Sequence, residues 1–319
     1  MPACTPHSTV LPMQAADVTG AVEYSTVVSS DGRFVSFDGI EVAYRDYGGA
    51  GRGDGLVLLH GIGGNLESMD GLARLLGVDR RVVSLDVRCC GQSGDADRFS
   101  LDDAASDVEI LVENLGLRNA AVVGASMGGI IAGYYGARHP EAAVVSIDGF
   151  AAGTLPHHSP EEAEDFAAWA TATRMGLELM TAPPETGDAA WMEEQVTRFL
   201  VLFDQLQYGS AQPETEARRQ FVALGDGRFR RHPARRVLDD QLADASRSMI
   251  HMFEECSGPV LVIYCTQTGW PVGLERELDE LARRKPKLLI RRLVASHTAP
   301  MWRESVATAA LIRRFLDSA

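Results

Sequence analysis

Short apolar runs recur along the chain and alternate with stretches of helical periodicity. The runs that we predict as strands read "FVSF", "IEVAYRDYG", "GLVLLHG", "RVVSLDVR", "AAVVGAS", "AVVSIDG", "PVLVIYC" and "KLLIRRLV". The first two flank Asp38-Gly39, a dipeptide typical of a hairpin turn. Most of the others are continuously apolar, which favours strands that are buried on both faces of a sheet.

Between most of these runs, apolar residues follow the period of an α-helix. In "LDDAASDVEILVENLG" they fall at Leu101, Val108, Leu111, Val112 and Leu115. Helices are predicted likewise for "GGIIAGYYGARHP", "LERELDELARRK" and the final "RESVATAALIRRFL". Strand–helix alternation predicts an α/β fold with a mostly parallel sheet and helices on both faces.

The alternation breaks over residues 151–257, where we identify no convincing strand. Helices are predicted for "SPEEAEDFAAWATATRMGLELM", "DAAWMEEQVTRFLVLFDQLQ" and "RRVLDDQLADASRSMIHMFEEC". An insertion of this size between two strands of one sheet predicts a helical cap. The expected organisation is therefore a core of residues 25–150 and 258–319, a cap over 151–257, and a loosely docked extension over 1–24.

Composition narrows the class of protein. The 319 residues are 45% hydrophobic and 23% charged, as in an ordinary globular protein. A net charge of −14 argues against a nucleic-acid partner. No apolar run reaches the roughly 18 residues of a membrane span, and the first residues do not resemble a secretory signal. We therefore expect no membrane association and a cytoplasmic location.

The cysteines agree with a reducing compartment, because they are odd in number and scattered. They are Cys4, Cys89, Cys90, Cys256 and Cys265. Arginine far outnumbers lysine, which appears only at Lys285 and Lys287. This bias is the basis for the hypothesis of a GC-rich bacterial source. The oligomeric state stays open.

The stretch "VVGASMGG" carries the strongest chemical signal. A predicted strand runs into Gly124-Ala125-Ser126-Met127-Gly128 and then into a helix, which is the setting of a G-x-S-x-G nucleophile turn. Backbone N–H groups at the start of that helix would stabilise charge that develops next to Ser126. The alternative is a glycine-rich turn that only packs a helix on a strand.

The stretch "LVLLHGIGGN" resembles an H-G-x-G loop whose backbone N–H binds an oxyanion. The two oxyanion donors would be the N–H groups of Ile62 and Met127. We interpret His60 as a structural residue of the loop. His297 follows the last predicted strand in "RRLVASHTAPMW".

Together these residues resemble the α/β-hydrolase superfamily with a helical cap, over about Ser25 to the C-terminus except the cap. The stretch "SLDVRCCGQSG" resembles the D-x-R-G-x-G-x-S segment of that family, with Cys89 in place of the usual glycine. A redox role for Cys89 is an alternative without support from neighbouring residues. The resemblance implies an eight-stranded sheet, Ser126 as nucleophile and His297 as base. A serine forms an acyl-enzyme, unlike the aspartate of haloalkane dehalogenases and epoxide hydrolases.

The resemblance also implies an acid after "PVLVIYC", and this chain has Thr268 at that position. Asp148 ends the strand "AVVSIDG", where some relatives carry the acid instead. The chain order Ser126, Asp148, His297 satisfies a triad. One alternative is that Asp148 is a structural strand-end residue. Another is that Glu275 or Asp279 is the acid of the triad, but these two residues fit better on an exposed helix face.

We therefore expect a serine hydrolase that cleaves an ester, thioester or lactone of a hydrophobic small molecule, with no metal and no cofactor. Candidate pocket residues are Phe150, His157, Trp169 and Trp270. One alternative is a biosynthetic enzyme of the same fold that performs C–C cleavage, elimination or cyclisation. Another is a non-catalytic ligand receptor, against which the intact Ser126 and His297 argue.

Overall fold

The computed structural model describes residues 29–49, 54–150, 159–180, 185–205, 212–244 and 250–319. The predicted N-terminal extension and His157 lie outside these residues. All eight predicted runs form strands of one sheet. They are β1 (Ser30–Val35), β2 (Glu41–Asp46), β3 (Asp54–Leu59), β4 (Val82–Leu85), β5 (Arg118–Ala125), β6 (Val144–Ile147), β10 (Val260–Cys265) and β11 (Leu288–Leu293).

The sheet has the strand order β1-β2-β4-β3-β5-β6-β10-β11. The β1–β2 hairpin and the β2–β4 pair are antiparallel, and the other pairs are parallel. The predicted α/β-hydrolase fold with its mostly parallel eight-stranded sheet is confirmed. The carboxyl ends of β3, β5 and β6 lie side by side, so the loops that follow them meet at one edge of the sheet.

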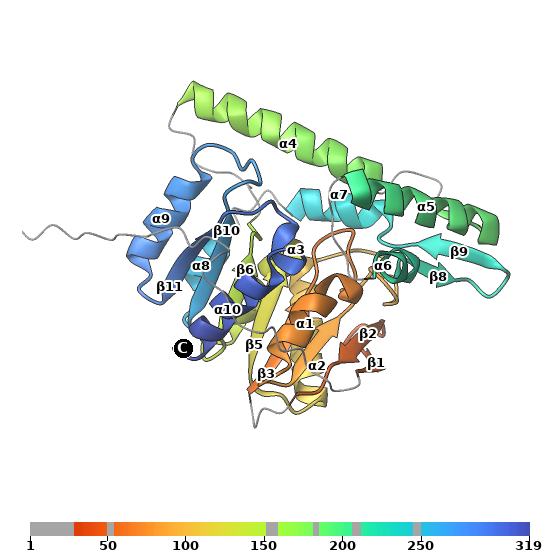
Figure 1. Cartoon of the computed structure of the whole chain (residues 1–319), viewed down its shortest axis with the longest axis horizontal. Helices are drawn as coiled ribbons and strands as arrows, with labels where there is room; N and C mark the ends of the chain where they lie inside the picture. Colours follow the sequence, from red (N-terminus) through yellow and green to blue (C-terminus); the bar gives the residue numbers. More distant parts are fainter. Residues whose placement is uncertain (1–28, 50–53, 151–158, 181–184, 206–211, 245–249) are drawn as a thin grey trace, which may run out of the picture.

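Helices cover both faces of the sheet, and the apolar strands supply side chains to both. Leu56 and Leu58 of β3 pack toward one face, while Val57 and Leu59 pack toward the other. The first face is covered by α1 (Asp70–Leu76) and α10 (Ser305–Leu316), which lie side by side in Figure 1. The second face is covered by α2 (Leu101–Asn114), α3 (Met127–Arg138), α8 (Ile250–Glu255) and α9 (Leu274–Arg284).

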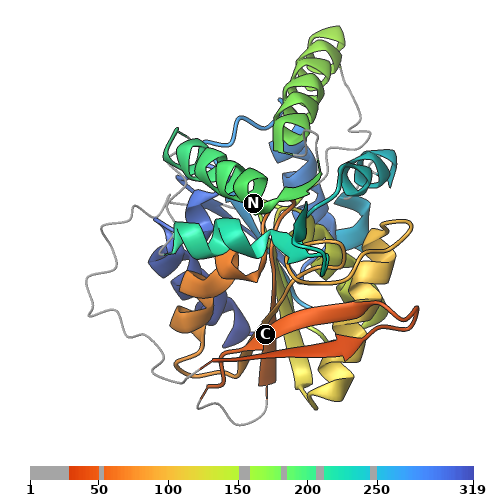
Figure 2. The same cartoon turned by 90° about the vertical axis from the view of Figure 1, so that its right-hand side faces the viewer.

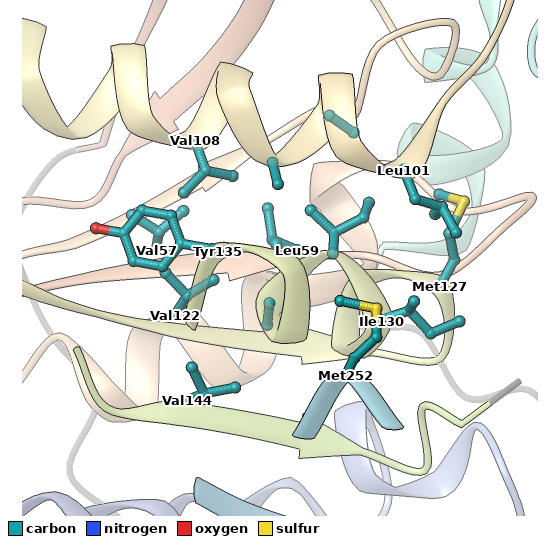
Figure 3. Packing of buried hydrophobic residues seen from close by; sticks show 14 of the residues in the cluster. Val57, Leu59, Leu101, Val108, Val122, Met127, Ile130, Tyr135, Val144 and Met252 are labelled. Atoms are coloured by element: carbon teal, nitrogen blue, oxygen red, sulfur yellow. The ribbon is translucent and has the colours of Figure 1, made fainter. Parts of the chain in front are cut away.

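The core on the second face is drawn in Figure 3. Val57 and Leu59 meet Val108 of α2 and Ile130 of α3 there, and Met252 of α8 closes the cluster. Burial on both faces is the physical reason that these strands carry uninterrupted apolar runs.

The described residues between β6 and β10 form five helices and a second sheet. The elements are α4 (Pro160–Met180), β7 (Thr186–Asp188), α5 (Ala189–Gln205), α6 (Pro213–Arg219), β8 (Phe221–Ala223), β9 (Arg228–Arg231) and α7 (Arg235–Asp244), followed by α8. The predicted helix over 235–256 is thus described as α7 and α8, with residues 245–249 outside the description.

The expectation of an exclusively helical segment was wrong. Strands β7, β9 and β8 form a small antiparallel sheet in that order. They are only three or four residues long and include Arg228, Arg230 and Arg231, so no apolar alternation marks them. The turn Gly225-Asp226-Gly227, with positive φ at both glycines, was the available hairpin signal.

This small sheet has a core of its own with α5 and α6. Val196, Phe199 and Phe203 of α5 pack there with Ala217 of α6 and Phe221 of β8. We call α5, α6 and β7–β9 the insert subdomain. In Figure 1 it lies at the side of the main sheet, with α6 next to α1.

Helix α4 differs from the insert subdomain because none of its described side chains is buried. It extends away from the sheet in Figure 2. Glu162 forms an ion pair with Arg276 of α9 at 2.6 Å, and Asp165 accepts a hydrogen bond from the Val272 N–H at 2.8 Å. In the described parts of the chain, no helix is both long and apolar enough to span a bilayer.

Candidate active site

Ser126 occupies a tight turn between β5 and α3. Its φ of +51° is positive, a backbone conformation that is strained for residues other than glycine. A Cβ added to Gly124 would lie 2.0 Å from the backbone of Gly128, and one added to Gly128 would lie 2.3 Å from the carbonyl oxygen of Leu59. Both glycines of the motif are therefore required by close backbone approach, which holds the serine at the carboxyl edge of the sheet.

Asp148 follows β6 and contacts His297 directly. The Nδ1 atom of His297 lies 2.8 Å from Oδ2 of Asp148. Since a carboxylate accepts, Nδ1 carries the hydrogen and Nε2 is left to take a proton. The Asp148 side chain is fully buried, whereas that of His297 is 35% exposed. The structure thus brings together the two residues that the sequence analysis paired.

The stretch Tyr264–Trp270, where the acid is absent, surrounds Asp148 with hydrogen-bond donors. Oδ1 accepts from the Cys265 N–H at 2.9 Å and from Nε1 of Trp270 at 2.8 Å. Oδ2 accepts from the Thr268 hydroxyl at 2.6 Å. All three of these donors are neutral groups.

The same turn also holds the loop that carries His297. The Gln267 N–H donates to the carbonyl oxygen of Ala295 at 3.0 Å, and the Thr266 N–H donates to that of Leu293 at 3.0 Å. Thr268 therefore lies in a turn that fixes both partners of the Asp148–His297 bond.

Aromatic rings connect this region to α4. The Trp270 ring meets His297 edge-on, with centroids 5.9 Å apart, and its centroid lies 5.3 Å from that of Trp169. Phe150 packs edge-on against Trp270 at 5.2 Å and is buried. Trp169 and Trp270 are partly exposed, so of the predicted pocket residues these two have surface available for a ligand.

The loop after β3 reaches Ser126 from the other side. A Cβ added to Gly61 would lie 3.1 Å from Cβ of Ser126, so the Gly61 backbone adjoins the serine. His60 is buried and holds this loop: Nδ1 donates to the carbonyl oxygen of Gly61 at 2.7 Å, and Nε2 accepts from the Val87 N–H at 3.0 Å. Burial lowers the pKa of His60, which keeps the ring neutral.

Ile62 follows Gly61 in this loop, and Met127 is the first residue of α3. Within the described residues, neither of their N–H groups donates to a backbone acceptor.

The segment "SLDVRCCGQSG" supports these loops. Asp86 accepts from the Leu66 N–H at 2.8 Å and from Nε of Arg219 at 3.0 Å. Arg88 is buried and pairs with Asp107 at 2.7 Å. Cys89 has a φ of +64° at the position of the usual glycine, and burial raises its thiol pKa. A protonated, buried thiol is a poor nucleophile, which favours the structural interpretation of Cys89.

Neither metal clusters nor disulfides occur in the described ranges. No group of three His, Cys, Asp or Glu residues there has the arrangement of a metal site. The four described cysteines, Cys89, Cys90, Cys256 and Cys265, are free and buried.

Comparison with known proteins agrees with the observed fold. The model of the alpha/beta hydrolase fold family matches residues 55–304, well over half of the chain. The chain belongs to the α/β-hydrolase fold family.

Two curated relatives show partial matches. The dihydrolipoyllysine-residue acetyltransferase component of the acetoin cleaving system of Pseudomonas putida is 30% identical over 196 residues, which cover 60% of this chain and 50% of the relative. The bifunctional esterase/perhydrolase DCH of Acinetobacter calcoaceticus is 37% identical over 107 residues, covering 32% and 38%. The chain thus spans half or less of the length of these relatives.

Among solved structures, E-2-(acetamidomethylene)succinate hydrolase is similar with a TM-score of 0.69 and 19% identity. The match covers 91% of this chain and all of that one. At this identity the likeness concerns the fold.

Proposed function

We propose that this protein is a serine hydrolase that cleaves an ester, thioester or lactone of a hydrophobic small molecule through an acyl-enzyme. The observation that carries the proposal is the Asp148–His297 hydrogen bond of 2.8 Å at the sheet edge where Ser126 is held in its turn. Membership of the hydrolase family and the similarity to an esterase support the reaction class.

The proposed reaction has two steps. Nε2 of His297 takes the proton of Ser126 as the serine oxygen attacks the carbonyl carbon, and the imidazolium then protonates the leaving group. Water attacks the acyl-enzyme with the same histidine as base, which releases the acid and restores the serine. Asp148 keeps Nδ1 protonated and stabilises the imidazolium.

The N–H groups of Ile62 and Met127 would bind the oxyanion of each tetrahedral intermediate. This role rests on two observations: Ile62 lies in the loop that adjoins Ser126 and Met127 follows Ser126 at the start of α3, and neither N–H has a backbone acceptor in the described structure. The chemistry needs neither a metal nor an organic cofactor.

Residues 151–257 would act as a cap that selects the substrate. The Trp270 ring lies next to His297, and the ring of Trp169 of α4 lies next to that of Trp270. Both rings are partly exposed, which favours a substrate with an apolar group. C–C cleavage or another biosynthetic reaction at the same residues is the competing function.

The test is labelling with a fluorophosphonate, followed by turnover of p-nitrophenyl esters of increasing acyl length. Ser126→Ala should abolish both, and Ser257→Ala, a change at an exposed serine, should abolish neither. Labelling that persists in Ser126→Ala contradicts the proposed nucleophile. Labelling of the wild type without turnover of any ester favours the biosynthetic alternative.

A further inference from the structure

A hydrogen-bonded chain of peptide groups connects the insert subdomain to the Ile62 N–H. The peptide that joins Gly61 to Ile62 has its carbonyl oxygen on one side and this N–H on the other, because a trans peptide directs them oppositely. The Gly61 oxygen accepts from the Gly64 N–H at 3.1 Å, in addition to the bond from His60. The orientation of the Ile62 N–H is therefore set from the opposite side of its own peptide.

The next peptide in this chain is held by a side chain of the insert subdomain. The Gly64 N–H belongs to the peptide whose carbonyl oxygen is that of Gly63, and this oxygen accepts from Nε2 of Gln220 at 2.7 Å. The sequence of bonds thus runs from Gln220 through the Gly63–Gly64 peptide and the Gly61–Ile62 peptide to the Ile62 N–H. Each bond polarises the next, which strengthens the last donor.

Gln220 is itself rigidly placed. It follows α6, its N–H donates to the Ala217 carbonyl oxygen at 3.3 Å, and its own carbonyl oxygen accepts from the His232 N–H at 2.7 Å. Two further bonds join the insert subdomain to the same region: Asn65 Nδ2 donates to the Glu216 carbonyl oxygen at 2.8 Å, and Gln92 Nε2 donates to that of Arg219 at 2.9 Å.

The burial of Gln220 argues for a role beyond stability. Its side chain is completely buried, and within the described structure Oε1 has no hydrogen-bond partner. A buried amide with one unsatisfied end is less stable than an apolar side chain of similar size. Unlike an apolar side chain, the amide donates a hydrogen bond to the Gly63 oxygen.

We propose that Gln220 is a positioning residue for the oxyanion hole, acting through the two peptides that end at the Ile62 N–H. The proposal rests on the function proposed above. It makes the insert subdomain part of the catalytic apparatus as well as a cover over the site.

The test compares three variants. Gln220→Met removes the donor and keeps the size, and Gln220→Glu keeps a donor only when the carboxyl is protonated. Gln195→Met makes the same change at another buried glutamine of the insert subdomain. Oε1 of Gln195 lies 3.5 Å from Nη1 of Arg198, and Gln195 is far along the chain from the loop that contains Ile62. Readouts are p-nitrophenyl ester hydrolysis, the rate of fluorophosphonate labelling, and thermal melting.

Removing one oxyanion donor outright costs about 100- to 1000-fold in kcat, so loss of the residue that positions it should cost about 10- to 50-fold. We expect this fall for Gln220→Met, with KM within about twofold to threefold and a melting temperature no lower than that of Gln195→Met. Gln220→Glu should add a loss of kcat as pH rises through the pKa of the introduced carboxyl, because the ionised form repels the Gly63 oxygen. Equal kcat in Gln220→Met and Gln195→Met overturns the proposal.

A measurement without substrate separates this proposal from the proposed function. In amide NMR spectra, Gln220→Met should shift the Gly64 and Ile62 N–H resonances more than Gln195→Met does, since both bonds of the chain weaken. Unmoved resonances overturn the proposal even if the enzyme hydrolyses esters. A wild type that the fluorophosphonate does not label overturns the hydrolase function, while the amide shifts still decide the role of Gln220.

Discussion

The two sides of the Ser126 turn are built in different ways. On the β6 side, a buried carboxylate accepts hydrogen bonds from the Cys265 N–H at the end of β10, and from the Thr268 hydroxyl and Trp270 Nε1 in the turn that follows. On the β3 side, the groups are backbone peptides, held by the His60 side chain of the same loop and by Gln220 of the insert subdomain. The side that carries Asp148, the proposed acid side, thus depends on single side chains. The proposed oxyanion side depends on the placement of a whole loop.

This difference predicts how the two sides respond to substitution. Substitutions on the acid side should act directly on the Asp148 carboxylate and should lower kcat strongly. Changes on the oxyanion side act through peptide groups and should be smaller, and in Gln220→Met they should appear in kcat without a loss of stability.

Asp148→Asn should have the largest effect, a fall in kcat of about ten-thousandfold, because a neutral amide neither stabilises the imidazolium nor enforces its tautomer. Steady-state hydrolysis of an aryl ester measures it. Asp279→Asn, which changes a partly exposed acid that pairs with Arg292, is the matched control and should leave kcat within about twofold. Wild-type activity in Asp148→Asn would remove this residue from the proposed triad.

Thr268→Asp should restore part of the activity lost in Asp148→Asn. The Thr268 oxygen lies 2.6 Å from the carboxylate oxygen that contacts His297, so a carboxylate at position 268 lies within a short side-chain movement of the imidazole. We expect a recovery of about 100-fold over the single variant, as part of the charge effect returns. Thr268→Asn in the same background carries no charge and should recover nothing. Equal kcat in both double variants would show that position 268 does not reach His297.

Thr268→Val and Trp270→Phe should each lower kcat by about tenfold, the usual effect of one hydrogen bond to a charged group. Each change keeps most of the side-chain volume and removes one donor to Asp148. Trp169→Phe serves as the control, since Trp169 contacts the Trp270 ring but donates no hydrogen bond to Asp148 in the described structure. If Trp169→Phe lowers kcat as much as Trp270→Phe does, ring packing and not the N–H donor is responsible.

The smallest effect that we expect is a dependence of the free energy of unfolding on pH, caused by His60 in the loop after β3. Burial lowers the pKa of His60 in the folded protein below the value of 6.5 for the free side chain, so the unfolded state binds a proton first as pH falls. The stability contributed by neutral His60 is therefore present above pH 6.5 and is lost as pH falls toward the folded pKa. The free energy of unfolding should fall by about 1 kcal/mol for each pH unit in this window.

Urea titrations from pH 7 to pH 5 measure this dependence. His60→Asn, which does not titrate, should show a shallower pH dependence than the wild type. Equal slopes in the two proteins would mean that His60 does not titrate during unfolding.

The sequence predicted most of the main sheet, because strands buried on both faces must be continuously apolar. It failed for β7–β9, whose three or four residues carry arginines and are stabilised by the separate core around Phe199 and Phe221. Helices α1 and α6 were also not predicted, since seven residues give too little periodicity. The chemistry of Ser126, Asp148 and His297 was visible as residue types after predicted strands.

The supporting residues were not visible in the same way. Thr268 was considered only as a residue that lacks the expected charge, and Trp270 only as a pocket residue, although both donate to Asp148. Gln220 lies 157 positions from Gly63, and nothing in its local sequence indicates that bond. A hydrogen bond between distant segments leaves no periodic pattern and so escapes this kind of prediction.

By itself, the sequence determined the α/β sheet, the strained serine turn and the order of serine, acid and histidine, because burial and close glycine packing restrict which residues are possible. Only the tertiary structure decided how "YCTQTG" functions. Folding brings it beside Asp148 at the end of another strand. There the uncharged Thr268 of this stretch and the adjoining Trp270 donate hydrogen bonds to the Asp148 carboxylate. The tertiary structure also decided that a residue of the insertion reaches the loop of Ile62, because that contact depends on how two separate cores pack together.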